Sequence, residues 1–383
     1  MWLDSPRNPK APLAGLKVLE LARVLAGPWA GQILADLGAD VIKIESPEGD
    51  GTRQWGPPWI ERENGEREAA YYHATNRGKR SIVADFRNEE DLARVRELAA
   101  SADIALENFK TGKLAKFGLD YDSLAKANPA LVYGRVTGWG QYGPLAHAAG
   151  HDINYVALSG ALGAIGSKEQ PAVPLNLVGD FGGGSMYCAM GILAALFERQ
   201  SSGKGQVVDA AIVDGVTSLM SFFYGQPHSA LRTVDRGAGL LGGAAHFYRC
   251  YTCKDGKEVS VGAIEPQFYA ELLQRADAPE HLRERQMDPS KWDDYADDFA
   301  ELFATKTQAE WCELLEGTDA CFSPVVPLDH AKDHPHMKAR GAFVEHGGRW
   351  HTAPAPRFDR TPNTIRDSAE DGDQVVARWA EGG

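Results

Sequence analysis

Cysteine is scarce in this 383-residue sequence, and its five cysteines are scattered over a large chain. An odd number at wide spacing does not form a disulfide framework, so we expect free thiols in a reducing compartment. Cys250 and Cys253 form one Cys-x-x-Cys pair, but no second close pair completes a zinc site and the flanking residues favour a strand. The sequence therefore predicts neither a disulfide-stabilised fold nor a metal site.

Positive charge and long apolar runs are also in short supply. The chain has 40 Lys and Arg against 53 Asp and Glu, which gives a formal net charge of −13. This balance argues against a nucleic-acid or membrane partner, although a local basic patch can still receive a phosphorylated ligand. The N-terminus lacks the apolar core of a signal peptide, and no later segment shows the uninterrupted apolar run of a membrane helix. We expect a soluble, cytoplasmic protein.

Two nucleotide-binding fingerprints are missing as well. The turn after the first expected strand, Ala22-Arg-Val-Leu-Ala-Gly-Pro-Trp-Ala-Gly, lacks the Gly-x-Gly-x-x-Gly pattern of dinucleotide sites. The chain also contains no Gly-x-x-x-x-Gly-Lys-Ser/Thr loop. Nicotinamide redox chemistry is therefore disfavoured, and nucleotide hydrolysis has no local support.

Short apolar runs that alternate with helical patterns fill the first half of the chain. Strands are predicted over residues 16–21, 41–44, 81–86, 103–106 and 131–136, and helices over 89–100, 153–162 and 183–198. This alternation predicts an α/β fold whose large, Rossmann-like domain contains a mostly parallel sheet.

After Phe222 the pattern changes to that of a smaller α+β domain. A hairpin is predicted to join 246–253 to 258–261, helices are predicted over 267–275, 292–303 and 308–315, and a strand over 321–326. We therefore expect a large α/β domain over 1–225, a small α+β domain over 226–330 and a C-terminal segment over 331–383, with a possible hairpin near 345–351.

A histidine and two carboxylates stand inside compact motifs: Gly150-His-Asp-Ile-Asn-Tyr, Leu175-Asn-Leu-Val-Gly-Asp-Phe-Gly-Gly-Gly and Gly262-Ala-Ile-Glu-Pro-Gln-Phe. Moving a proton from one face to the other of a carbon next to a carbonyl requires two acid/base groups. His151, Asp180 and Glu265 suit that chemistry. Each also fits an ordinary helix start, and the three glycines after Asp180 suit either close approach of a ligand or tight helix packing.

In this order the motifs resemble those of the α-methylacyl-CoA racemases within the class III CoA-transferase (CaiB/BaiF) family. The resemblance runs from about residue 13 to about 356 and includes Leu16-Lys-Val-Leu-Glu-Leu, Glu107-Asn-Phe-Lys, Arg199-Gln-Ser-Ser-Gly-Lys-Gly-Gln and Gly317-Thr-Asp-Ala-Cys-Phe-Ser-Pro-Val. It implies that His151 and Asp180 act on opposite faces of the substrate's α-carbon. It also implies that Glu265 orients and charge-balances the histidine.

The same resemblance implies a homodimer of interlocked chains, in which the C-terminal segment returns to the large domain. Glu265 could then reach the site from the partner chain. CoA enters as part of the acyl-CoA substrate, and no other cofactor is required. The residues that the resemblance assigns to CoA are Ala84, Asp85, Phe86, Arg87, Asn108, Phe109, Lys110, Lys116, Gly150, Asp152 and Tyr155.

The chain departs from the compact racemases after Glu45, where an insertion through Tyr72 resembles the transferase branch. We expect the insertion to bear on CoA binding or access, with Arg53 contributing affinity for the substrate.

Three functions remain open. In a racemase, a 2-methylacyl-CoA thioester is deprotonated to an enolate and reprotonated on the other face. In a CoA-transferase, Asp180 attacks the thioester and passes through an acyl anhydride and an aspartyl-CoA thioester. The third possibility is a catalytically silent acyl-CoA binding protein. The sequence does not specify the acyl group.

Overall fold

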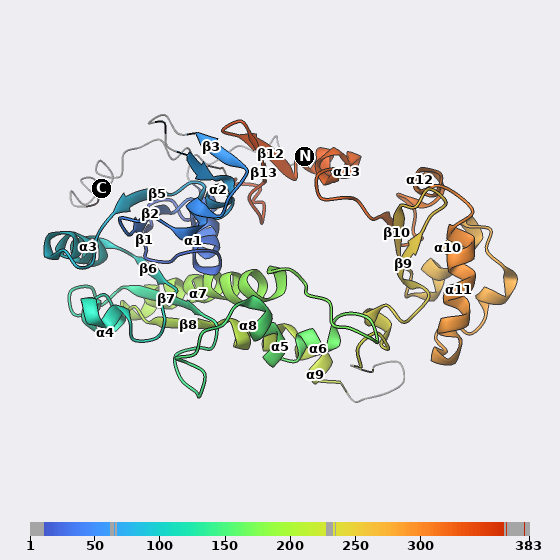
Figure 1. The fold of residues 1–383 in the computed structure, drawn as a ribbon, viewed down its shortest axis with the longest axis horizontal. Coiled ribbons are helices and arrows are strands. Elements are labelled where there is room, and N and C mark those ends of the chain that lie inside the picture. Colours follow the sequence, from blue (N-terminus) through green and yellow to red (C-terminus); the bar gives the residue numbers. More distant parts are fainter. Residues whose placement is uncertain are drawn as a thin grey trace. The chain divides into compact units, whose positions relative to one another are not determined.

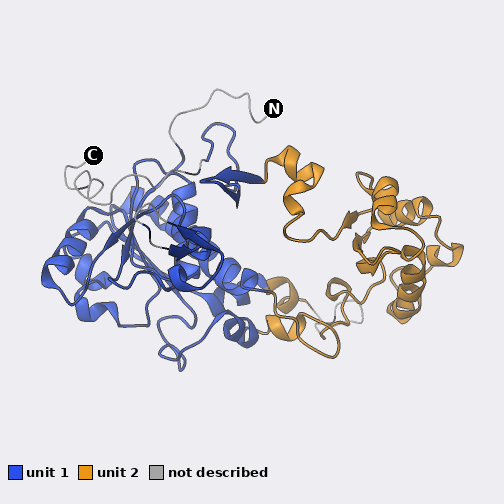
Figure 2. Ribbon diagram, turned by 45° about the horizontal axis from the view of Figure 1, so that its top comes forward, with its two compact units in different colours: residues 1–159, 175–219, 343–383 blue, residues 160–174, 220–342 orange. Residues whose placement is uncertain are grey.

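The computed structural model describes residues 11–61, 65, 67–226, 233, 235–363, 365 and 379 (Figure 1). It divides into two compact units, which Figure 2 colours separately. Unit 1 comprises residues 1–159, 175–219 and 343–383, and unit 2 comprises residues 160–174 and 220–342.

These boundaries differ from the predicted ones at three places, the first being that the longer part of unit 2 begins at Met220 and not at residue 226. Residues 160–174 belong to unit 2, where the Arg236 guanidinium donates hydrogen bonds to the backbone oxygens of Ser167, at 2.7 Å, and Gly163, at 3.2 Å. The return to unit 1 begins at Phe343 and not at residue 331, because the helix α13 (Pro335–Arg340) is still part of unit 2.

A six-stranded parallel sheet forms the centre of unit 1, in the order β5-β2-β1-β6-β7-β8 (Figure 1). The strands are β1 (Lys17–Glu20), β2 (Asp40–Glu45), β5 (Arg80–Val83), β6 (Ile104–Glu107), β7 (Val132–Thr137) and β8 (Val207–Ala211). The predicted α/β fold with a parallel sheet is therefore confirmed. β8 was not predicted, because Asp209 interrupts its short apolar run, which follows a glycine-rich turn.

Alternating side chains separate the two faces of this sheet. Leu19 lies in register with Ile42 and Ala105, and all three are buried in a core that also contains residues of the helices α3 (Glu89–Ser101) and α4 (Tyr121–Leu124). The helices α1 (Ala26–Asp36) and α7 (Tyr187–Ser202) also contact the strands. A Cβ atom on Gly134 of β7 would lie 2.8 Å from Ile192 of α7, so the glycine permits close helix packing.

Three further helices lie near the carboxyl ends of the last strands. They are α5 (Asp152–Leu158), a π-helix (Leu177–Met186) that leads directly into α7, and α8 (Ile212–Leu219). The predicted helix over 153–162 is too long, because Gly160 adopts a left-handed conformation with φ of 82° and separates α5 from the short helix α6 (Ala161–Ala164).

The continuous segment Leu177–Ser202 is long and apolar enough, by length and composition alone, to cross a membrane; its mean hydropathy is 1.2. The expectation that no segment would pass this test is therefore wrong. The core helix of a soluble protein passes the same test, however. Its α7 portion contacts β7 and β8, and its buried residues include Cys188 and Ile192, so we interpret it as a helix packed on the sheet.

The insertion after β2 folds over unit 1 as a 3₁₀ turn (Gly51–Gln54), a hairpin of β3 (Trp59–Glu61) and β4 (Arg67–Ala69), and the helix α2 (Ala70–Asn76). A buried ionic network ties it to the sheet. Lys43 lies 3.1 Å from Glu20 and 3.0 Å from Asp50, with all three side chains fully buried. The insertion is thus an integral part of the unit.

Arg53 belongs to this network and does not provide a free charge for the substrate. Its guanidinium donates to Glu45 at 2.7 Å, pairs with Glu68 and lies 3.5 Å from the centre of the Tyr72 ring. Although burial raises the pKa of Glu45, hydrogen bonds from Arg53 and Ser81 hold it at about 2. The expected contribution of Arg53 to substrate affinity is therefore corrected to a structural one.

We predict that Arg53→Gln lowers the free energy of unfolding by about 3 kcal/mol, because it removes the cation that balances the buried carboxylates of Glu45 and Glu68. Urea denaturation measures this change. Arg87→Gln is the matched control, because Arg87 pairs with Asp85 at the surface and its side chain is 75% exposed. Its expected change is below about 0.5 kcal/mol. Equal losses in the two variants would contradict the assignment.

Unit 2 contains a three-stranded antiparallel sheet in the order β11-β10-β9. Its elements include α9 (Ser221–Tyr224), β9 (Tyr248–Thr252), β10 (Glu258–Gly262), α10 (Pro266–Arg275), α11 (Trp292–Phe303), α12 (Gln308–Leu315) and β11 (Phe322–Pro324). The predicted hairpin and the three predicted helices after it are present. Fully buried aromatic residues, including Phe247, Phe299 and Trp311, form its core. The predicted C-terminal hairpin is β12 (Phe343–His346) with β13 (Arg349–Thr352), in unit 1.

Candidate active site

His151 occupies the position just before the first turn of α5. Its backbone is extended, with φ of −130° and ψ of 170°, and its N–H donates to the Asn154 Oδ1 at 3.0 Å. This hydrogen bond explains why the motif places an asparagine three residues after the histidine. The His151 side chain is exposed, so its imidazole is accessible to a ligand.

Asp180 lies in the π-helix, a form with i→i+5 hydrogen bonds that occurs frequently at functional sites. The Phe181 N–H donates to the Asn176 oxygen at 3.1 Å, and the Phe181 ring packs on Trp29 with 4.4 Å between ring centres. The Ser185 hydroxyl donates to the Asp180 backbone oxygen at 2.9 Å. These contacts fix the backbone on both sides of the carboxylate.

The glycines after Asp180 serve helix packing in this structure. A Cβ atom on Gly183 would lie 2.7 Å from the Val216 side chain, and one on Gly184 would lie 2.9 Å from Ile212. Both neighbours belong to α8. Of the two interpretations of this glycine run, the structure therefore supports tight packing.

Asp152 connects the two candidate acid/base residues. It follows His151 directly, and its Oδ1 accepts a hydrogen bond from the Asp180 backbone N–H at 2.6 Å. His151 and Asp180, which are far apart in the sequence, are thus joined by one peptide bond and one hydrogen bond. The sequence motifs predicted the two residues but not this link.

The surroundings of Asp180 favour its protonated form. Burial and, to a smaller extent, the charge of Asp152 raise the pKa of Asp180 to about 7. At such a pKa the group is able both to release and to accept a proton near neutral pH. A carboxyl with an ordinary pKa would be almost fully ionised there and a poor acid.

Glu265 belongs to unit 2, so unit 1 by itself does not contain the third predicted residue. Its side chain is exposed at the start of α10, with Pro266 as the first helical residue. This is the local arrangement that an ordinary helix start would have.

A cavity of about 260 Å³ opens at the carboxyl ends of β1, β2, β5 and β6. The chain order reverses between β1 and β6, and open α/β sheets bind ligands at such switch points. Its lining includes Ala84, Asp85, Phe86, Arg87 and Phe109, five of the residues predicted to contact CoA. The structure thus brings residues from two separate predicted segments to one cavity.

The other predicted CoA residues are placed differently. The Asn108 Oδ1 accepts a hydrogen bond from the Arg23 backbone N–H at 2.9 Å. This bond holds the backbone of Arg23, which lines the cavity. Lys110 and Lys116 are not among its lining residues, whereas Arg23 and Lys113 are. Arg23 lies 4.6 Å from the centre of the Phe109 ring. Lys113, which lies between the two predicted lysines in the sequence, lines the cavity in their place.

Gly150 and Tyr155 lie beside the acid/base pair and not in this cavity. The Tyr155 ring meets Trp139 edge-on, with ring centres 4.7 Å apart, and a Cβ atom on Gly150 would lie 2.8 Å from Tyr155. Burial and the charges of Asp180 and Asp152 raise the pKa of Tyr155 to about 12, so it stays a neutral phenol. Trp139, which was not predicted as a site residue, is thus the aromatic neighbour of Tyr155.

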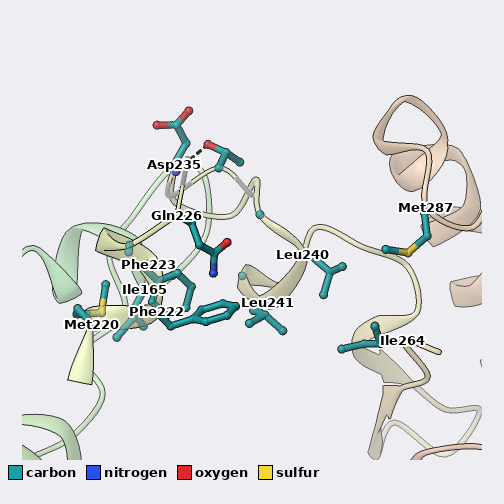
Figure 3. A pocket seen from close by; sticks show the side chains of 15 residues that line it. Ile165, Met220, Phe222, Phe223, Gln226, Asp235, Leu240, Leu241, Ile264 and Met287 are labelled. Atoms are coloured by element: carbon teal, nitrogen blue, oxygen red, sulfur yellow. Dashed lines mark hydrogen bonds between the residues drawn. The ribbon is translucent and has the colours of Figure 1, made fainter. Parts of the chain in front are cut away.

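Unit 2 contains an apolar cavity of about 630 Å³ (Figure 3). Its lining side chains include Ile165, Met220, Phe222, Phe223, Leu240, Leu241, Ile264 and Met287. Flexible methionines and aromatic rings make such a wall adaptable to differently shaped apolar groups. Within residues 11–61, 67–226 and 235–363, no group of three His, Cys, Asp or Glu side chains could hold a metal ion.

Comparison with known proteins gives a consistent family match. The model of CoA-transferase family III matches residues 13–370. The alpha-methylacyl-CoA racemase of Mus musculus is 41% identical over 352 residues, which cover 91% of this chain and 87% of the relative. The alpha-methylacyl-CoA racemase of Homo sapiens is 41% identical over 335 residues, which cover 87% and 82%.

A transferase and a solved structure complete the comparison. The succinate–glutarate CoA-transferase of Agrobacterium fabrum is 52% identical over 221 residues, which cover 57% of this chain and 55% of that relative. The crystal structure of a CAIB/BAIF family protein from Brucella suis superimposes with a TM-score of 0.81 at 34% identity, covering 97% of this chain and 99% of that one.

Proposed function

The chain belongs to CoA-transferase family III, and from this premise and the geometry of the site we propose that it racemises 2-methylacyl-CoA thioesters. The observation that carries the proposal is the pair of His151 and Asp180, linked through Asp152, with the pKa of Asp180 raised to about 7. The two racemase relatives are 41% identical over most of the chain, whereas two transferase relatives that match 90% of it are only 31% and 30% identical. The racemase function is therefore the better supported one.

In this mechanism one residue removes the proton from the carbon next to the thioester carbonyl, and the other returns a proton to the opposite face. Neutral His151 and protonated Asp180 form the pair for one direction. Protonated His151 and ionised Asp180 form it for the other, so each turnover leaves the enzyme ready for the reverse reaction. The thioester itself acidifies the α-proton, and no further cofactor is required.

We assign the CoA moiety to the cavity at the carboxyl edge of the sheet, where Arg23 and Lys113 supply charge for phosphates and Arg87 is paired with Asp85. Taken by itself, the apolar cavity of unit 2 suits an alkyl or aryl group, and its methionines make it adaptable to several shapes. We expect broad acyl specificity.

We also propose a cytoplasmic homodimer of interlocked chains. Met186 at the end of the π-helix and Met190, Leu193 and Phe197 on α7 form one stripe and are 37% to 75% exposed. A stripe of large apolar side chains on a single helix face favours burial against another protein surface. In such a dimer Glu265 could serve the site of the partner chain as the orienting carboxylate for His151.

CoA transfer is the second candidate, because the transferase relative is 52% identical over its matched segment. In that reaction Asp180 becomes covalently linked, first to the acyl group and then to CoA.

Each enantiomer of a 2-methylacyl-CoA, incubated separately with the enzyme and a free carboxylic acid, distinguishes the two functions. We expect both enantiomers to converge on a 1:1 mixture by chiral analysis, with no CoA passing to the free acid. Hydroxylamine or borohydride should trap no adduct on Asp180. CoA transfer without loss of optical purity would contradict the proposal.

A further inference from the structure

We propose that Asp152 is the positioning residue for Asp180: its carboxylate holds the Asp180 backbone and keeps a negative charge beside the Asp180 side chain. This inference rests on the proposed function only for its kinetic consequences. The resemblance assigns Asp152 to CoA binding, whereas the structure gives its carboxylate a different contact.

The geometry of the contact is specific. Asp152 Oδ1 lies 2.6 Å from the Asp180 nitrogen, at the short end of the range for an N–H donor and an ionised acceptor. A Cβ atom on Gly179 would lie only 2.1 Å from the same Oδ1. A glycine is therefore required at position 179 for the carboxylate to approach, and the Gly179-Asp180 dipeptide and Asp152 act as one unit.

The contact joins two helices that are separated in the sequence. Asp152 is the first residue of α5, and Asp180 lies near the start of the π-helix. The wider helix leaves its first N–H groups without intrahelical partners, and Asp152 satisfies one of them. Among the described residues, the second carboxylate oxygen of Asp152, Oδ2, is buried without a hydrogen-bond partner.

Asp152 is the charged neighbour that affects the pKa of Asp180. Ionisable groups on the elements packed against the π-helix are Asp36 on α1, Tyr133 and Arg135 on β7, Asp152 and Tyr155 on α5, Tyr187, Cys188, Glu198 and Arg199 on α7, Asp209 on β8 and Asp214 on α8. Within the described chain, Asp152 is the charge that acts on Asp180, adding to the effect of burial. Tyr155 is neutral.

Burial raises the pKa of Asp152 itself, while the Asp180 and Gly179 N–H groups lower it. The two backbone donors therefore favour the charged form of Asp152. Its negative charge disfavours a second charge on Asp180, and so favours the proton that Asp180 must donate. Removing the charge should lower the proton affinity of the acid/base pair as a whole.

Two variants separate the hydrogen bond from the charge. Asp152→Asn keeps an oxygen acceptor but removes the charge, and Asp152→Ala removes both. Asp209→Asn is the control, because Asp209 is another carboxylate that accepts a backbone N–H, from Gln141 at 3.3 Å, but at an exposed position. It takes no part in the site.

The first readout is the pH dependence of kcat/KM for racemisation. In Asp152→Asn the bell-shaped profile should move to lower pH by about one unit, with its maximum within about threefold of wild type. In Asp152→Ala the maximum should fall a further ~10-fold, because the backbone of Asp180 is no longer held. A profile of Asp152→Asn that superimposes on wild type, or an equal shift in Asp209→Asn, would overturn the electrostatic role.

The second readout does not depend on activity. Backbone hydrogen exchange of the peptide over 177–186 should be about 10-fold faster in Asp152→Ala, and near wild type in Asp152→Asn and Asp209→Asn. Unchanged exchange in Asp152→Ala would overturn the backbone role. If the wild-type enzyme does not racemise while Asp152→Ala still accelerates exchange, the proposed function fails and the hydrogen bond stands.

Discussion

Asp180→Asn is expected to lower racemisation by roughly 10²–10⁴-fold, the range in which an acid/base group contributes to catalysis. Asparagine preserves the shape of the side chain and the backbone hydrogen bond to Asp152, but it neither gives nor takes a proton at neutral pH. The rate is measured by chiral analysis of a single-enantiomer 2-methylacyl-CoA. Binding of the ester, measured by calorimetry, should be nearly unchanged.

Asp209→Asn serves as the control for Asp180 as well, since it makes the same chemical change at an exposed carboxylate on β8. Its racemisation rate should equal that of wild type. An Asp180→Asn enzyme within about twofold of wild type would remove Asp180 from the mechanism, because that loss is far below the range expected for an acid/base group.

His151→Gln is expected to cause a loss of the same size, roughly 10²–10⁴-fold. The exposed imidazole at the start of α5 is the base for the face of the α-carbon that Asp180 does not serve. Glutamine can donate and accept hydrogen bonds but cannot carry a proton between them. Racemisation is again measured by chiral analysis.

Proton exchange without inversion separates the roles of the two residues. In heavy water each variant should still exchange the α-proton of the one enantiomer that faces its remaining base, and the two variants should select opposite enantiomers. If both variants exchanged the same enantiomer, His151 and Asp180 would not lie on opposite faces, and the two-base mechanism would be wrong.

The regular parts of the fold follow from local patterns. Five of the six sheet strands, the hairpin of β9 and β10, and α11 and α12 were predictable, because apolar periodicity at 2 or 3.6 residues reflects which side chains face a core. The predictions were less accurate where a single backbone conformation decides the outcome. Gly160 ended α5 early, and the π-helix replaced the expected start of α7.

The candidate site shows the same division between local and distant information. The motifs around His151 and Asp180 identified both residues, but the hydrogen bond from Asp180 to Asp152 connects positions 28 residues apart. Arg53 was expected to contribute affinity for the substrate, but the structure places two carboxylates around it. Lys113 could not be distinguished from Lys110 and Lys116, because the direction of each side chain depends on a turn without a clear periodicity.

The most direct test of the account follows solvent deuterium with the wild-type enzyme. One enantiomer of a 2-methylacyl-CoA is incubated in heavy water, and the ester and the intact protein are both analysed by mass spectrometry. We predict deuterium at the α-carbon together with inversion of configuration, and no added mass on the protein. An acyl or CoA adduct on Asp180, with the α-proton of the substrate retained, would contradict the account and assign the site to CoA transfer.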